Sequence, residues 1–233
     1  GIILGILIST KISHLAILPL PILALFFRNF KLSNIKTGLQ HNLPNTLNFL
    51  KQAILLLTTS ALIFFLTNPY IVLDYQSFRN SMSYESSVAL GTLPVFYTGE
   101  FKNSIPMVFQ FLHVYPFILN PILTILFIPS FIYLLLIAIK RKHTPFMLLA
   151  SCFLLLFFSQ AFLYVKWTRY MIPTLPFIYL ILAVALSDLS KLKFLSQYLV
   201  LCLLIGINLL FSISYFITAF VQEDTRIAAE KFA

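Results

Sequence analysis

Residues 117–143 read FILNPILTILFIPSFIYLLLIAIKRKH, a long apolar run that stops at a basic cluster. An α-helix needs about 20 mostly apolar residues to cross the hydrocarbon core of a bilayer, and this run is long enough. Four further runs have the same character, at 53–73, 145–165, 170–186 and 198–220. Together with the apolar start of the chain at 1–27, they predict an all-α, polytopic integral membrane helix bundle of about six membrane segments.

The composition supports the same fold class. Of the 233 residues, 60% are hydrophobic and 10% are charged, and the mean hydropathy is +0.94. Soluble domains carry about 25% charged residues, so a soluble fold of this composition could not cover its apolar surface. The net charge of +9 is spread over short Lys and Arg clusters between apolar runs, which argues against a nucleic-acid partner.

Cys152 and Cys202 both lie inside apolar runs, which favours packing roles over a disulfide or a metal site. No metal-binding motif, nucleophile elbow or phosphate-binding glycine loop occurs in the sequence. A divalent metal therefore stays open but is not indicated, and no cofactor is identified.

The first apolar stretch, at 1–27, is interrupted by the polar residues of 9–14. It is either a truncated helix that turns at Lys11 into a second helix, or one long tilted helix; we favour the turn. Gly1 and Gly5 form a GxxxG pair, which permits close helix contact. Because the chain begins inside an apolar run without a methionine, we interpret it as an internal piece of a longer protein.

The longest loop, at 74–116, is rich in aromatic residues and carries several acids. Tyr75, Phe78 and Met82 fall at helical spacing, so part of this loop is expected to form an amphipathic helix on the membrane surface. We expect residues 1–233 to form a single transmembrane domain. The loop at 74–116 is then external, and 222–233 begins an external C-terminal region.

The distribution of basic residues predicts the orientation. Three loops, at 28–52, 140–143 and 188–195, hold nine Lys or Arg and one acid, Asp188. The other loops, at 74–116, 166–169 and 222–233, hold six Lys or Arg together with the remaining six acids. Under the positive-inside rule the first set faces the cytoplasm. We therefore expect a multi-pass protein of the cell (plasma) membrane, with the loop at 74–116, the turn at 166–169 and the tail at 222–233 on its outer face.

The strongest candidate for a site is the stretch 166–176, where Lys166, Arg169 and Tyr170 precede a helix that begins with two prolines. A guanidinium at such an entry can hold a phosphate through paired hydrogen bonds. The alternative is that these side chains only form an interfacial belt of snorkelling cations and aromatic rings.

Two further positions could contribute to a site on the same face. If the chain turns at Lys11, which His14 follows in the sequence, Lys11 lies on the same outer face as Arg169, and two cations converging there would suit an anionic lipid headgroup; alternatively, Lys11 is a helix-end lysine that reaches for water. Asn68 and Tyr70 flank Pro69, and Asp74 follows. Asp74 could act as a base, a metal ligand or a partner of Arg169, or it could cap the next helix.

Four segments resemble motifs of the GT-C membrane glycosyltransferases. Residues 5–11 look like a "GLA…TK" stretch, and residues 65–78 resemble an "NPY…D…F" element at the start of a long external loop. Residues 169–176 are similar to an "RYxxPxxP" helix entry, and residues 224–229 look like a "DxRxxA" opening of an external region. The closest branch is the protein-mannosyltransferase-like and aminoarabinose-transferase-like group.

The resemblance implies transfer of a sugar from a polyprenyl-phosphate donor to a protein, lipid or glycan acceptor at the outer membrane face. It places Arg169, Tyr170, Lys11 and Lys166 at the donor phosphate or sugar, with Asn68, Tyr70 and Asp74 as support. The family's acidic first-loop motif has no counterpart here. By resemblance, the catalytic base is expected upstream of Gly1, outside this fragment.

Two rival functions remain open besides a purely structural membrane subunit. A transporter or flippase of lipid-linked sugars needs polar groups at mid-helix, and the apolar runs offer few beyond Ser60, Ser159, Gln160 and Asn208. A polysaccharide polymerase or ligase is expected to place several arginines in one external loop, whereas the loop at 74–116 has only Arg79.

Overall fold

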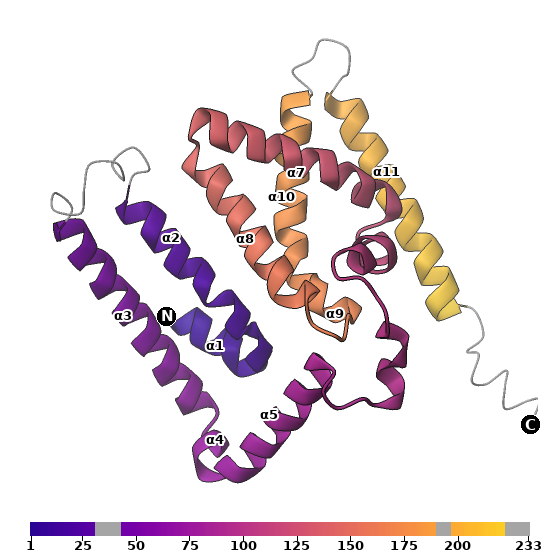
Figure 1. Ribbon diagram of the computed structural model, residues 1–233. Helices are drawn as coiled ribbons and strands as arrows, with labels where there is room; N and C mark the ends of the chain where they lie inside the picture. Colours follow the sequence, from indigo (N-terminus) through magenta and orange to yellow (C-terminus); the bar gives the residue numbers. More distant parts are fainter. Residues whose placement is uncertain (31–42, 190–196, 222–233) are drawn as a thin grey trace, which may run out of the picture.

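The computed structural model describes residues 1–30, 43–189 and 197–221, and within these ranges all regular secondary structure is helical, with no strand (Figure 1). The predicted all-α fold class is thus confirmed for the described residues. The elements are α1 (Ile2–Thr10), η1 (Ile12–Ile17), α2 (Pro19–Asn29), α3 (Leu43–Thr67), α4 (Tyr70–Leu73), α5 (Tyr75–Leu90), η4 (Phe96–Phe101), η5 (Gln110–Val114), α6 (Tyr115–Ile118), α7 (Pro121–Arg141), α8 (Thr144–Ala161), α9 (Thr168–Met171), η6 (Ile172–Thr174), α10 (Leu175–Leu189), α11 (Gln197–Phe216) and η7 (Ile217–Val221).

Four helical stretches are long and apolar enough to cross a membrane: Pro44–Thr67, Pro121–Arg141, Thr144–Ala161 and Thr168–Asp188. Two shorter apolar stretches, His14–Asn29 and Cys202–Phe216, accompany them. The sequence prediction is therefore confirmed in its coarser form: the described chain is all-helical, and four of its helices are long and apolar enough to cross a membrane.

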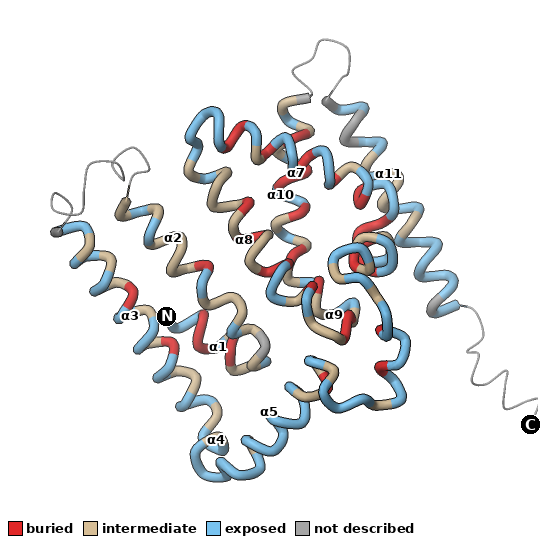
Figure 2. Tube along the Cα trace, viewed as in Figure 1, coloured by how far each residue is buried: buried red, intermediate tan, exposed pale blue. Residues whose placement is uncertain are grey.

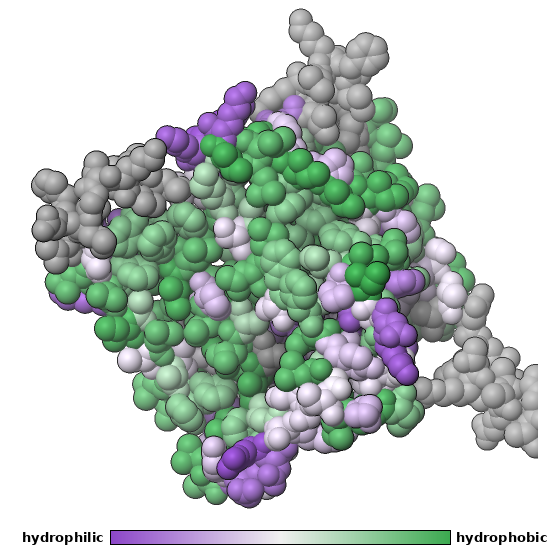
Figure 3. Space-filling model, in the orientation of Figure 1, coloured by the Kyte–Doolittle hydropathy of each residue, from purple (hydrophilic) through white to green (hydrophobic). Residues whose placement is uncertain are grey.

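The face of the bundle that is visible in Figure 3 is largely apolar between its two ends. Large side chains such as Leu55, Ile125 and Leu210 are each about two-thirds exposed. Buried residues instead concentrate on the inner sides of α7, α8 and α10, while α5 and α11 are mostly exposed (Figure 2). Contiguous apolar surface of this extent is expected where lipid replaces water around a protein.

The turn at Lys11 is present in the structure. Lys11 has extended backbone angles, φ −160° and ψ 120°, and ends α1; η1 then leads into α2. Pro19, at the first position of α2, starts that helix without losing a hydrogen bond, because the first helical N–H has no intrahelical partner. The alternative of one long tilted helix is thereby excluded.

Small residues bring α1 against α3. A Cβ atom added to Gly5 would lie 2.7 Å from the Ser60 carbonyl oxygen, and one added to Gly1 would lie 2.5 Å from the Thr59 Cβ atom. Ser9 lies one turn after Gly5 on α1, and its hydroxyl is 2.6 Å from the hydroxyl of Thr67 on α3. The GxxxG pair thus makes the close helix contact that its spacing permits.

A second group of helices, α7, α8 and α10, encloses the largest apolar core. Asn120 begins α7: its side-chain oxygen accepts a hydrogen bond from the Leu123 N–H at 2.8 Å. Its amide nitrogen donates to the Asn208 oxygen at 2.7 Å and so ties α11 to the start of α7. Asn120 has φ +96° and ψ 157°, a strained backbone region that is almost confined to glycine, and its two side-chain hydrogen bonds hold it there.

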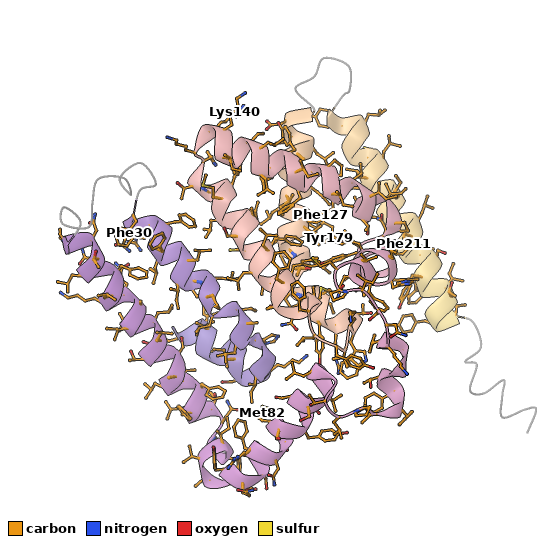
Figure 4. All side chains as sticks on the ribbon, viewed as in Figure 1. Phe30, Met82, Phe127, Lys140, Tyr179 and Phe211 are labelled. Carbon is orange, nitrogen blue, oxygen red and sulfur yellow. The ribbon has the colours of Figure 1, made fainter. Side chains whose placement is uncertain are left out.

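The predicted surface helix in the loop at 74–116 is observed as α5. Met82 lies on it, at the end of the molecule opposite Lys140 (Figure 4). Asp74 is its N-cap, and a side-chain oxygen accepts from the Ser77 N–H at 3.3 Å. Gly91 ends the helix in the left-handed conformation, φ +76°. The predicted external region 222–233, with the motif at 224–229, lies outside the described residues.

Candidate functional site

Three separate segments meet in one small pocket at the end of the bundle where α1 turns. The turn after α1 supplies Lys11 and His14, α8 supplies Gln160 near its end, and α9 supplies Arg169 and Tyr170. Ala16, Ile17, Leu156 and Pro173 complete the lining. We call this the Lys11–Arg169 pocket. It lies away from the end of the bundle that carries Lys140 (Figure 4).

The local backbone at 167–175 positions the α9 side chains. Trp167 is extended, with φ −62° and ψ 140°, and α9 starts after it. Pro173 has no N–H to donate, and the chain passes through the 3-10 turn η6 before α10 begins. The helical path is therefore interrupted at Pro173, and Arg169 and Tyr170 lie on the short helix α9 that precedes this interruption.

Aromatic rings hold the two cations of the pocket. The Lys11 Nζ atom lies 5.3 Å from the centroid of the Tyr170 ring. The Arg169 guanidinium carbon lies 4.3 Å from the Trp167 ring centroid and 5.6 Å from that of Tyr170. Cation–π contacts at these distances contribute about 0.5–1 kcal/mol each at exposed sites. Both cations thus share one tyrosine as a platform.

The pocket is electropositive and small. Within the described ranges, neither Lys11 nor Arg169 has a carboxylate at salt-bridge distance. The cavity measures about 30 Å³, whereas one water needs about 10–15 Å³. It therefore accommodates a group the size of a small anion, and anything larger attached to that anion extends out of the cavity.

Lys166, which the sequence grouped with Arg169, lies elsewhere. It is 5% exposed, and its Nζ atom donates to the Tyr164 carbonyl oxygen at 3.1 Å. The ring of Phe109 lies 6.0 Å from the same atom. Burial lowers the pKa of Lys166, because desolvation disfavours the charged form. Lys166 is not among the residues that line the Lys11–Arg169 pocket.

The proposed supporting residues Asn68, Tyr70 and Asp74 do not line this pocket either. The Asn68 amide nitrogen donates to the Phe64 carbonyl oxygen at 2.9 Å, so it stabilises the end of α3. Tyr70 is 75% exposed. Asp74 caps α5, which is the alternative that the sequence left open. Asp74 does not lie at salt-bridge distance from Arg169.

A buried tyrosine that the sequence did not single out supports the pocket from within the core. The Tyr115 hydroxyl lies 2.9 Å from the Thr174 hydroxyl and 3.6 Å from the Met171 sulfur. Burial raises the pKa of Tyr115. These contacts fix η6 and the end of α9. In the sequence, Tyr115 is one of many aromatic residues in its loop, and its spacing gives no sign of this role.

Within the described part of the chain, no group of three or more His, Cys, Asp or Glu side chains could hold a metal ion. Comparisons with known proteins found no family model, no curated protein and no solved structure that matches the chain. The function must therefore be argued from the chemistry of the pocket.

Proposed function

We propose that this chain is part of a membrane glycosyltransferase that moves a sugar from a polyprenyl-phosphate donor to an acceptor on the non-cytoplasmic face. The convergence of Lys11 and Arg169 on one small pocket without a carboxylate is the observation that supports this proposal most directly. Among the motifs that resemble glycosyltransferases, residues 5–11 and 169–176 contribute the two sides of that pocket.

The proposed orientation follows from the two ends of the bundle. Arg28, Lys140 and Arg141 lie at the ends of α2 and α7, which are at the other end of the bundle from the Lys11–Arg169 pocket (Figures 1 and 4). Under the positive-inside rule the basic end faces the cytoplasm. With η1–α2 and α11 counted beside the four long stretches, about six segments cross the cell membrane.

The chemistry required is stabilisation of a leaving phosphate. When the bond from the sugar carbon to the phosphate oxygen breaks, the oxygen keeps the electron pair and negative charge develops on the phosphate. A guanidinium can bind two of its oxygens in parallel, and an ammonium adds a point charge. Donors placed at developing charge lower the barrier more than those at existing charge. The pocket size suits the phosphate, with the sugar and prenyl chain outside it.

The test is sugar transfer by the full-length protein in proteoliposomes that contain a polyprenyl-phosphate sugar. Arg169→Ala should lower the transfer rate by about 100-fold or more, as expected for loss of one such donor. Arg79→Ala is the matched control, because Arg79 is an exposed arginine on α5 that does not line the pocket. Unchanged transfer by Arg169→Ala would overturn the proposal.

The same proteoliposomes distinguish the proposed transferase from the rival function, a flippase. A flippase of lipid-linked sugars would move the donor between leaflets without consuming it. Transbilayer movement of intact donor, abolished by Arg169→Ala in the absence of any transfer, would favour the transporter. Donor consumption with formation of a glycosylated acceptor supports the transferase.

A further inference from the structure

His14 lines the Lys11–Arg169 pocket with one ring nitrogen already committed. Its Nδ1 atom lies 3.0 Å from the Leu7 carbonyl oxygen. A carbonyl oxygen can only accept, so this contact is a hydrogen bond when Nδ1 carries the hydrogen. The Thr10 hydroxyl, 3.4 Å from Nδ1, does not compete for that nitrogen, because it donates to the Leu7 oxygen. In neutral His14 the other nitrogen, Nε2, therefore holds the lone pair. In the imidazolium form, Nε2 also carries a hydrogen and becomes a donor.

The end of α1 explains why this contact forms. Leu7 is one of the last four residues of α1, whose carbonyls lack intrahelical partners. Lys11 is extended and so does not continue the helix. The Thr10 hydroxyl also donates to the Leu7 oxygen, at 2.7 Å. η1 brings His14 back over α1, with its backbone N–H donating to the Lys11 carbonyl at 2.9 Å. The ring position is thus fixed by the helix end.

Nε2 of His14 has no hydrogen-bond partner among the residues that the structure describes. The charged and titratable groups beside it in the pocket are Lys11, Arg169 and Tyr170. The packed helices α1 and α8 add none to the pocket lining. Among the pocket residues in the described chain, His14 is therefore the one with a ring nitrogen that can either accept or donate a hydrogen bond, depending on its protonation.

We propose that His14 is the proton-binding ligand of the Lys11–Arg169 pocket. Its imidazolium donates from Nε2 to the phosphate of the bound donor, as a third cation beside Lys11 and Arg169. This inference rests on the proposed function, because it assumes that the anion in the pocket is the donor phosphate. Donor affinity then increases as the pH falls through the range in which histidine takes up a proton.

The test is equilibrium binding of a polyprenyl-phosphate sugar to the full-length protein in nanodiscs, between pH 5.5 and 8. The donor is a phosphodiester, so its own charge does not change in this range. For the wild type we expect about tenfold tighter binding at pH 5.5 than at pH 8, the effect of one added charge-assisted hydrogen bond.

Two variants separate the pocket role of His14 from its role in the turn. His14→Asn places an amide N–H near the position of Nδ1, which keeps a donor for the Leu7 carbonyl, and it removes Nε2. It should bind at all pH values as the wild type does at pH 8. His14→Gln places an uncharged donor near the position of Nε2, and it should bind without pH dependence and more tightly than His14→Asn. His113→Asn, at an exposed histidine outside the pocket, should retain the wild-type pH dependence.

The outcomes distinguish this inference from the proposed function. If the wild type binds the donor equally at both pH values, or if His14→Asn keeps the pH dependence, the role of His14 is overturned and the proposed function stands. If the wild type binds no donor at any pH, the proposed function itself fails.

Discussion

The ammonium group of Lys11 and the guanidinium of Arg169 share the ring of Tyr170, at 5.3 Å and 5.6 Å from its centroid. Lys11 comes from the beginning of the chain and Tyr170 from its second half, so their contact depends on the tertiary fold. An aromatic ring in contact with both cations reduces their freedom to extend into solvent. It therefore prepares both for an anion that binds between them.

Two substitutions of Tyr170 distinguish the contribution of its ring to donor affinity from that of its hydroxyl. Tyr170→Phe keeps the ring, so its affinity for a polyprenyl-phosphate sugar in nanodiscs should stay within about twofold of the wild type. Tyr170→Leu removes the ring's contact with both cations. Since each cation–π contact contributes roughly 0.5–1 kcal/mol, the loss of two contacts should weaken binding about tenfold. Tyr198→Leu, at an exposed tyrosine on α11, is the control. Equal affinities for the Phe and Leu variants would contradict a platform role.

Gly5→Ala tests the contact between α1 and α3. The added methyl group would lie 2.7 Å from the Ser60 carbonyl oxygen, which is backbone and cannot move aside alone. We expect the free energy of unfolding in mixed micelles to fall by about 1–3 kcal/mol, the usual range for overpacking. In Gly206→Ala the methyl group meets nothing within 4 Å, so stability should be unchanged or slightly higher. A Gly5→Ala protein as stable as Gly206→Ala would show that the helices are further apart.

The hydrogen bond between Asn120 and Asn208 can be measured with a double-mutant cycle. The two single Ala variants and the double variant should give a coupling energy of about 0.6 kcal/mol, and no more than roughly 1.7 kcal/mol, as for other hydrogen bonds between membrane helices. Asn120→Ala should cost more than Asn208→Ala, because Asn120 also caps α7. Additive single effects would mean that the bond between the two side chains contributes nothing.

Lys166→Met tests the burial of Lys166 apart from the pocket. The methionine can fill the same apolar space without a charge to desolvate, so thermal stability near neutral pH should rise. Donor binding should stay within about twofold of the wild type, because Lys166 does not line the Lys11–Arg169 pocket. A large loss of donor affinity in Lys166→Met would instead show that Lys166 contributes to donor binding.

The same residue makes stability depend on pH. The pKa of Lys166 is lowered in the folded protein from its ordinary value of 10.5. Between the two values the unfolded chain binds more protons than the folded one, so stability rises with pH in that interval. Unfolding of the wild type, measured at increasing alkaline pH, should show this rise, and Lys166→Met should lack that contribution. A parallel pH dependence in both proteins would assign the effect to other groups.

Sequence patterns predicted the helices that a bilayer would require, because apolar length and basic ends are local properties. The span expected at 117–139 is observed as α7, shifted toward Arg141, since Asn120 forms a cap that hydropathy does not register. The polar residues at 9–14 likewise predict the turn that the structure shows at Lys11.

The tertiary contacts of each side chain could not be predicted from such local sequence patterns. Lys166 and Arg169 lie three residues apart, yet one is buried beneath a loop and the other lines a pocket. The Lys166 ammonium group donates to the Tyr164 carbonyl, two residues away, and lies over the ring of Phe109, which comes from a distant segment. Likewise, only the packing of η1 against α8 shows that His14 lies beside Gln160. Such pairings between distant segments are set by the tertiary fold.

The contact between the two groups of helices determines how a bound anion would affect stability. The group formed by α1, α2 and α3 meets the α7, α8 and α10 group chiefly where α2 and η1 contact α8, and the Lys11–Arg169 pocket takes a side chain from each group. An anion bound there would contact both groups of helices and so hold them together. Stability gained from a ligand grows as RT ln(1 + [L]/Kd). Saturating donor should therefore raise the unfolding temperature and slow hydrogen exchange in η1 and α9 together, although the two turns belong to different halves of the chain.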